Sequence, residues 1–232
     1  MLKRAVNRYI SKSKGESYAI DDRIPTLFLL GVIFTRMMMK LRGRLVFMGR
    51  PYTPYLGRRV KLKVKSKIRM GKGVSIGNRC YIDALSTDGI HLGANVSVGT
   101  ATKIECTGIL RYLGKGLKAE DNVGLGSDNY YGCGGGIYIG RDTIVGNFVS
   151  FHAENHNFSG TDVPIRLQGI TRAGIKVGSN CWIGAKCTIL DDVIIEDGCI
   201  IAAGSVVKSG VYRENGIYAG VPAKFIKSRL GE

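Results

Sequence analysis

Residues 177–211 read VGSNCWIGAKCTILDDVIIEDGCIIAAGSVVKSGV, and this stretch carries a period of six residues. Every sixth position holds a valine or an isoleucine: Val177, Ile183, Ile189, Ile195, Ile201 and Val207. A second series holds small or medium side chains at the same step: Cys181, Cys187, Val193, Cys199, Ser205 and Val211. This period fits neither an α-helix nor an alternating strand, whose periods are about 3.6 and 2 residues. It is typical of a parallel β-helix, in which a short strand and a turn form each face of a coil.

The same period recurs upstream in three shifted blocks. Their members are Met70, Ile76 and Ile82; Leu92, Val98 and Ile104; and Ile139, Val145 and Phe151. Between the blocks lie segments without the period, which we expect to form loops: 83–90, 105–118, 127–138 and, longest, 157–174. The segment 127–138 contains Tyr130 and Tyr131, and it predicts either an exposed turn or an aromatic wall on which a ligand could stack. The chain's 33 glycines and only five prolines agree with many tight turns.

Positive charge is concentrated in the first third of the chain. Residues 1–72 hold 19 lysines and arginines but three acidic residues, a net charge of +16, whereas the remainder is neutral. This asymmetry indicates an anionic partner for the first third. We do not expect nucleic acid to be that partner, because the chain contains no recognised nucleic-acid-binding motif.

Residues 24–42 predict a helix that is apolar on one side and basic on another. The apolar residues are Leu27, Leu30, Phe34, Met37, Met38 and Leu41, and the basic residues are Arg36, Lys40 and Arg44. Two roles are open for this helix: a cap over the end of the coils, or contact with an anionic membrane. The apolar stretch is too short to span a bilayer, which needs about 20 residues.

These patterns divide the chain into three parts. We expect a basic N-terminal segment at 1–67, a β-helix at 68–221, and a tail at 222–232 that contains a short helix. Residues 58–67 alternate basic and other side chains, which predicts a strand or first coil with one basic face.

The six cysteines predict free thiols and no metal site. Cys80, Cys181, Cys187 and Cys199 occupy the small position of the repeat, and none of the six forms a CxxC pair. Residues 1–15 are basic and lack the apolar core of a secretory signal. We therefore expect a reducing, cytoplasmic location, with contact at the inner membrane if the helix binds lipid.

Four strings carry a resemblance to a known family. They are ENHNF at 154–158, CWIGA at 181–185, AAGSVVK at 202–208 and AGVPAK at 219–224. Over about residues 68–229 the chain resembles the hexapeptide-repeat acyltransferases, in particular the branch that O-acetylates sugars in capsule, exopolysaccharide and O-antigen synthesis. The resemblance implies a left-handed parallel β-helix, a homotrimer with active sites between subunits, an acetyl-CoA donor and a saccharide acceptor. An acceptor carried on a polyprenyl lipid would suit an enzyme at the membrane.

The resemblance also implies roles around the base. It makes His156 the general base, which a sugar hydroxyl needs because it is a poor nucleophile at neutral pH. Glu154 is a candidate to orient the imidazole, since residues two apart in a strand share a side; an exposed carboxylate is the alternative. Asn155 and Asn157 are predicted either to donate to the acceptor or to hold the turn. His152 is a weaker candidate for the base than His156.

Further substrate-binding residues come from the same resemblance. Trp182 lies on the acceptor side of the site or at a trimer contact. Ala185 and Ala203 mark where the coil backbone meets the pantetheine arm of the donor. Lys208 and Lys224 approach the nucleotide end, unless they are solvated surface charges.

The predicted function is an acetyl-CoA-dependent O-acetyltransferase acting on a sugar hydroxyl. An N-acetyltransferase acting on an amino sugar is the alternative, because it would use the same donor site. A metal-dependent hydratase of the carbonic anhydrase kind needs three neighbouring imidazoles, and His91 is far in sequence from His152 and His156. An ice-binding solenoid needs a regular outward threonine column, which the repeats lack.

Overall fold

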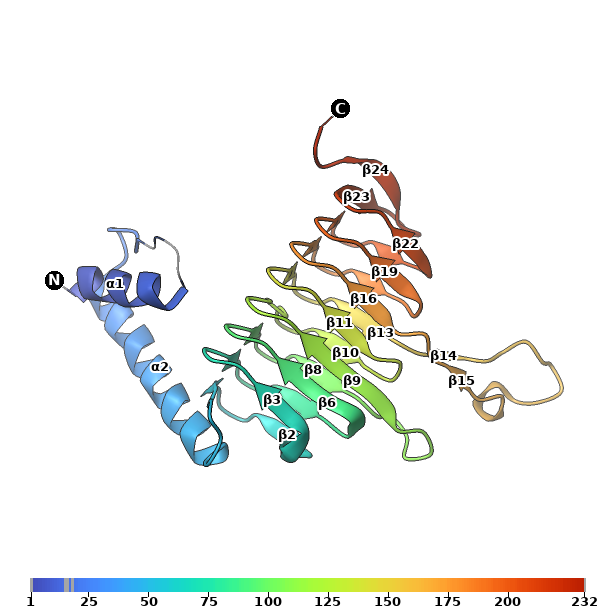
Figure 1. Ribbon diagram of the computed structural model, residues 1–232, viewed down its shortest axis with the longest axis horizontal. Coiled ribbons are helices and arrows are strands. Elements are labelled where there is room, and N and C mark those ends of the chain that lie inside the picture. The colour runs from blue at the N-terminus through green and yellow to red at the C-terminus, as the bar shows by residue number, and fades with distance from the viewer. Residues whose placement is uncertain (1, 15–16, 18, 232) are drawn as a thin grey trace.

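The computed structural model describes residues 2–14, 17 and 19–231, and it has two helices leading into a stack of parallel coils (Figure 1). Each coil contributes one short strand to each of three faces, and each strand pairs in parallel with its equivalents in neighbouring coils. This architecture confirms the predicted left-handed parallel β-helix. It arises because each hexad supplies one inward side chain and one corner.

The first face is made of a three-stranded and a five-stranded sheet, which isolated bridges through Gly124 connect. Its strands are β1 (Tyr55–Leu56), β4 (Ser75–Ile76), β7 (Ser97–Val98), β12 (Ile144–Val145), β17 (Trp182–Ile183), β20 (Ile200–Ile201) and β23 (Gly216–Ala219). The last strand of the chain, β24 (Lys224–Ser228), pairs antiparallel with β23 and ends this face.

The second and third faces are seven-stranded sheets. The second consists of β2 (Lys61–Lys63), β5 (Tyr81–Asp83), β8 (Lys103–Glu105), β10 (Tyr130–Gly132), β13 (Ser150–His152), β18 (Thr188–Ile189) and β21 (Val206–Val207). The third consists of β3 (Ile68–Met70), β6 (Ser86–Leu92), β9 (Gly114–Ala119), β11 (Ile137–Ile139), β16 (Ile175–Val177), β19 (Val193–Ile195) and β22 (Gly210–Tyr212). A 3-10 turn at Lys65–Lys67 joins β2 to β3.

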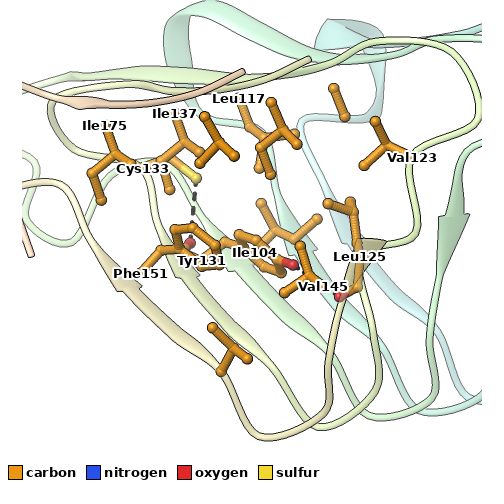
Figure 2. Packing of buried hydrophobic residues seen from close by; sticks show 14 of the residues in the cluster. Ile104, Leu117, Val123, Leu125, Tyr131, Cys133, Ile137, Val145, Phe151 and Ile175 are labelled. Carbon is orange, nitrogen blue, oxygen red and sulfur yellow. Dashed lines mark hydrogen bonds between the residues drawn. The ribbon is translucent and has the colours of Figure 1, made fainter. Parts of the chain in front are cut away.

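The inward side chains fill the space between the three faces. All six members of the first series, from Val177 to Val207, are buried. Figure 2 shows part of this packing, in which Tyr131 and Phe151 stack with their ring centroids 4.8 Å apart. The Tyr131 hydroxyl donates to the Leu125 carbonyl at 2.8 Å, so the hydrogen-bonding capacity of this buried phenol is satisfied.

All six cysteines are buried and free, and burial raises the pKa of the Cys80 and Cys181 thiols to about 11.

Two corners of the coil have different chemistry. Where the first face turns into the second, a Cβ on Gly184 would lie 2.5 Å from the amide nitrogen of Ala203, so the coils approach too closely for a side chain. Where the third face turns into the first, left-handed residues stack with their side chains hydrogen-bonded. Asn95 donates to Asn122 at 3.1 Å, and Asn122 donates to Asp142 at 2.8 Å. These ladders fix the spacing between coils.

The N-terminal helices are α1 (Leu2–Lys14) and α2 (Thr26–Val46). The C-terminal part of α2 covers the first coil: Phe47 is buried, and Gly43 lies against Pro54, whose carbonyl oxygen would be 1.8 Å from an added Cβ. Arg42 donates to the Leu56 carbonyl at 2.9 Å. This part of the helix therefore has the geometry of the predicted cap. Among the described residues, no helix is both long and apolar enough to cross a bilayer.

Three sequence expectations are wrong in detail. The coils begin at Tyr55, before the expected boundary at 68, because β1 and β2 already pair with the next coil. The expected C-terminal helix is instead β24, which covers the backbone groups at the edge of β23. The segments 83–90 and 127–138 are not loops, and 105–118 is a loop only in part, since β6, β9, β10 and the start of β11 lie in the coils. Val211 of the second series points outward and is 46% exposed.

We predict that Phe151→Ala lowers the free energy of unfolding by about 3–5 kcal/mol, because it removes a fully buried ring from a stack and leaves a cavity. Phe158→Ala is the matched control, since that ring is 75% exposed. Urea denaturation at one fixed protein concentration measures both. Equal midpoints for the two variants would contradict this account of the core.

Candidate functional site

A hairpin arm, residues 154–173, leaves the stack at the corner between the second and third faces (Figure 1). The chain exits after β13 and forms β14 (Asn155–His156), which pairs antiparallel with β15 (Ile170–Thr171). A 3-10 turn at Ile165–Leu167 lies in the outer part, and the chain returns to the third face at β16. The longest predicted insert is thus an ordered projection that carries His156.

An ion pair anchors the base of the arm. The Glu154 carboxylate lies 3.0 Å from Nη2 and 3.1 Å from Nε of Arg172. The same guanidinium donates to the carbonyls of Leu113, at 3.0 Å, and Tyr112, at 3.4 Å, in the loop of an earlier coil. Only 18% of the Arg172 side chain is exposed. The guanidinium of Arg172 therefore joins the two ends of the arm to each other and to the coils.

Asp191 fixes the point where the arm rejoins the stack. Its carboxylate accepts the backbone N–H of Gly174 at 2.7 Å and that of Ala173 at 3.0 Å. The residue is buried, so these two amides supply the hydrogen bonds that a buried carboxylate requires.

The outer part of the arm is held by amide side chains. Asn157 donates from Nδ2 to the Gln168 carbonyl at 3.1 Å, and its backbone N–H donates to Gly169 at 3.1 Å. Gln168 donates to the carbonyls of Gly160 and Val163, both at 2.7 Å. Of the two roles open to Asn157, these contacts support holding the turn. Asn155 presents an exposed side chain on β14.

The two histidines near the arm have different surroundings. His156 is exposed on β14, whereas His152 is half-buried in β13. The His152 ring lies 5.6 Å from the Tyr130 ring, and burial lowers the pKa of His152 below its usual 6.5. Burial, together with Glu105, raises the pKa of Tyr130 to about 12. His152 thus belongs to the packed surface of the second face, and His156 is open to a substrate.

The other predicted site residues fall on separate parts of the stack. Lys208 directly follows β21, at the same corner as the arm. Trp182 begins β17 on the first face, and Ala185 and Ala203 lie beyond β17 and β20, at the corner between the first and second faces. Lys224 begins β24 and is exposed. Within one chain, His156 and Lys208 therefore share a corner that Trp182 and the two alanines do not.

Trp182 stands in an outward apolar column. In register, Ile144 precedes it and Ile200 follows it on the first face. Ile144 and Trp182 are 54% and 52% exposed. Exposed aliphatic and aromatic side chains in one column are typical of a protein–protein contact.

Two family models match the coils. The model described as bacterial transferase hexapeptide (six repeats) matches residues 174–209, and the model described as hexapeptide repeat of succinyl-transferase matches residues 67–101. Both matched ranges lie where the repeat builds the three faces. The chain thus carries the hexapeptide repeat of the acyltransferase family that its sequence resembles. Comparison with curated proteins finds no match.

Solved structures similar to this chain include an N-acyltransferase and an O-acetyltransferase. A mutant of AntD, an N-acyltransferase from Bacillus cereus in complex with dTDP and coenzyme A, is 22% identical, with 75% of this chain and 85% of that chain covered and a TM-score of 0.49. A maltose O-acetyltransferase from Clostridium difficile 630 is 17% identical, with 85% and 87% covered and a TM-score of 0.37.

The sequence did not reveal two residues that hold the arm in place. Arg172 stands in the long insert, and its partners Tyr112 and Leu113 are about 60 positions away, so no local pattern connects them. Asp191 follows a repeat and looks like an ordinary turn residue. One signal was available in the sequence. Glu154 and Arg172 have opposite charges and stand at the two ends of the insert, and a hairpin brings such ends together.

We predict that Arg172→Gln loosens the arm without unfolding the coils. Hydrogen exchange of the amides at 154–172 should accelerate at least about tenfold, because the ion pair and two charge-assisted hydrogen bonds are lost. Arg166→Gln, an exposed change in the same arm, is the control and should leave exchange unchanged. Unaltered exchange in Arg172→Gln would show that the arm is held by other contacts.

Proposed function

We propose that the protein is an acetyl-CoA-dependent O-acetyltransferase that modifies a sugar hydroxyl in capsule, exopolysaccharide or O-antigen synthesis. The observation that supports it best is the exposed imidazole of His156 on an arm whose base is tied to the coils. A general base must reach the substrate and yet hold one position, and this arrangement meets both needs. The match to the bacterial transferase hexapeptide model supports the reaction class.

In the proposed reaction, His156 accepts the proton of the sugar hydroxyl while that oxygen attacks the thioester carbonyl carbon of acetyl-CoA. The tetrahedral intermediate then expels the coenzyme A thiolate, which takes the proton back from the imidazolium. The products are the O-acetyl sugar and coenzyme A. His152 is a poorer candidate for the base, because it is packed against Tyr130.

Glu154 has a positioning role in this proposal. Its carboxylate is engaged by Arg172, so it holds β14 against the coils and thereby sets where the imidazole stands. Asn155, exposed beside His156, is the proposed donor to the acceptor sugar. Asn157 shapes the arm through Gln168 and Gly169.

We propose that the donor lies along the corner marked by Ala185 and Ala203, with its phosphates near Lys208 or Lys224. The coil backbones approach closely there, and small side chains leave room for the amides of pantetheine. Both lysines are exposed and are free to meet an anionic group.

A homotrimer would join the two halves of the proposed site. His156 and Trp182 stand on different parts of one chain, so a neighbouring subunit is required if both contact one acceptor. Two exposed apolar surfaces support such a contact. One is the column with Ile144 and Trp182, and the other comprises the arm residues Phe158, Val163, Ile165 and Leu167.

The central test compares hydroxyl and amino acceptors under the same conditions. We expect acetyl transfer from labelled acetyl-CoA to a sugar hydroxyl, with product mass and alkali lability identifying an ester. His156→Ala should lower turnover by about 100- to 10,000-fold with little change in acetyl-CoA affinity. His152→Ala, the matched control, should retain most activity. Alkali-stable product on an amino sugar alone would favour the N-acetyltransferase alternative, and a fully active His156→Ala enzyme would refute the proposed base.

We predict that Lys208→Glu or Lys224→Glu weakens coenzyme A binding roughly tenfold more than dephospho-coenzyme A binding, if that side chain meets the terminal phosphate. Calorimetric titration of both ligands measures the difference. Lys176→Glu on the third face is the control, because it makes the same charge change at another exposed position. Equal losses for the two ligands would remove these lysines from the phosphate site.

A further inference from the structure

The N-terminal half of α2 exposes an unusual amount of apolar surface. Residues 27–34 read LFLLGVIF and contain no polar residue, so every side of the helix is apolar there. Leu27 is 80% exposed and Phe28 is 64% exposed, and among the apolar residues of α2 only Leu29 is fully buried. Apolar surface continues along the helix through Met37, Leu41 and Leu45. A helix that is apolar on all sides needs an apolar surrounding.

Capping does not account for this surface. The cap uses the other end of the helix, where Gly43 and Phe47 meet the first coil. Figure 1 shows that α2 leads away from the coils and that α1 lies across its far end. The apolar half therefore stands apart from the β-helix that the cap covers.

Two basic residues of α2 contact the coils. The Arg36 guanidinium lies 5.4 Å from the centre of the Tyr55 ring and donates to the Ser75 hydroxyl at 3.1 Å. Lys40 lies over the same ring and donates to the Thr53 carbonyl at 2.6 Å. These side chains orient α2 on β1, so they are not the ones expected to meet a distant anionic surface.

Other basic residues surround the same end of the molecule. Residues 26–72 contain 13 lysines and arginines and no acidic residue. Arg44, Arg58, Arg59 and Lys61 are exposed, and none has an ion-pair partner among the residues that the structure describes. Arg44 lies on α2, and the other three lie on the first coil, which contacts the C-terminal part of α2. On α1, Arg4 and Arg8 are exposed as well.

The charge decides between two possible surroundings for the apolar half. A second copy of the chain would bring two sets of like charges together, at an unfavourable electrostatic cost. A bilayer with anionic headgroups would neutralise the basic residues while its acyl region covers the apolar side chains. Anionic lipid therefore complements both features at once.

We propose that this end of the protein binds the surface of an anionic phospholipid bilayer. The N-terminal half of α2 enters the interface, and the basic side chains of α1, α2 and the first coil meet the headgroups. This inference does not depend on the acyl-transfer proposal, because vesicle binding is measured without substrates.

The test is flotation of the intact protein with vesicles. Vesicles of phosphatidylcholine and phosphatidylglycerol should carry the protein, whereas vesicles of phosphatidylcholine alone should carry little. Raising NaCl from about 0.05 M to about 0.5 M should weaken binding, because the screening length shortens. Retention of the protein on both vesicle types at either salt concentration would show a purely apolar interaction and overturn the role of charge.

Two matched pairs of variants separate the contributions. The triple change Leu27→Ser, Phe28→Ser and Phe34→Ser should abolish binding, whereas Leu110→Ser with Leu230→Ser, at equally exposed positions elsewhere, should not. The triple change Arg44→Gln, Arg58→Gln and Arg59→Gln should lower the partition coefficient about 100-fold. Arg141→Gln, Lys176→Gln and Lys227→Gln remove the same charge from later coils and should have little effect.

Light scattering of the same variants measures their oligomeric state and tests the alternative that α2 packs against other copies of the chain. The proposal is wrong if the wild-type protein does not bind anionic vesicles at low salt and the apolar triple variant forms a smaller oligomer than the wild type. That result would show that α2 packs against other copies of the chain. Circular dichroism confirms that each variant keeps its coils, since all of the changed residues are exposed.

Discussion

Each coil must match its neighbours in height and width, because every strand hydrogen-bonds to the equivalent strand above and below it. The inward columns set the width, and the corners set the height. At Gly184 the next coil comes so close that no Cβ fits, and at Asn95 and Asn122 the side chains bond from coil to coil. The interior of this pattern is filled by side chains, so the features that distinguish this chain lie on its outer surface and where the chain leaves the pattern.

The arm is the largest such departure, and its stability has a separate source. It contributes almost nothing to the inner core, and Phe158 at its outer part is exposed. Polar contacts hold it instead: Glu154 with Arg172 at the base, and Asp191 at the return to the third face. Because these polar contacts anchor the arm to a rigid stack, His156 projects outward from a fixed position along the stack. The same stack presents Trp182 and its apolar column on another face, where a neighbouring subunit would complete the proposed site.

The N-terminal end solves a different problem. A stack of parallel strands leaves an open edge at each end, which would pair with other chains if it were bare. Phe47 and the end of α2 cover the first coil, and β24 covers the last. The rest of α2 exceeds what a cap needs, and its basic surroundings give that end of the molecule a chemistry that the neutral coils lack. One half of this helix thus caps the fold, and in our proposal the other half binds a bilayer surface.

The sequence by itself determined the coil stack, because a period of six is a local property that every repeat restates. It also identified the long insert and its histidine, since both interrupt or adjoin the period. The structure decided how the interruptions fold. Arg172 meets carbonyls 59 and 60 positions away, Arg36 meets Ser75, and Tyr131 joins the core from a segment that looked like a turn. The tail became a strand because β23 offered an unpaired edge. Each of these outcomes depends on which coils lie side by side, and that arrangement exists only after the chain has wound.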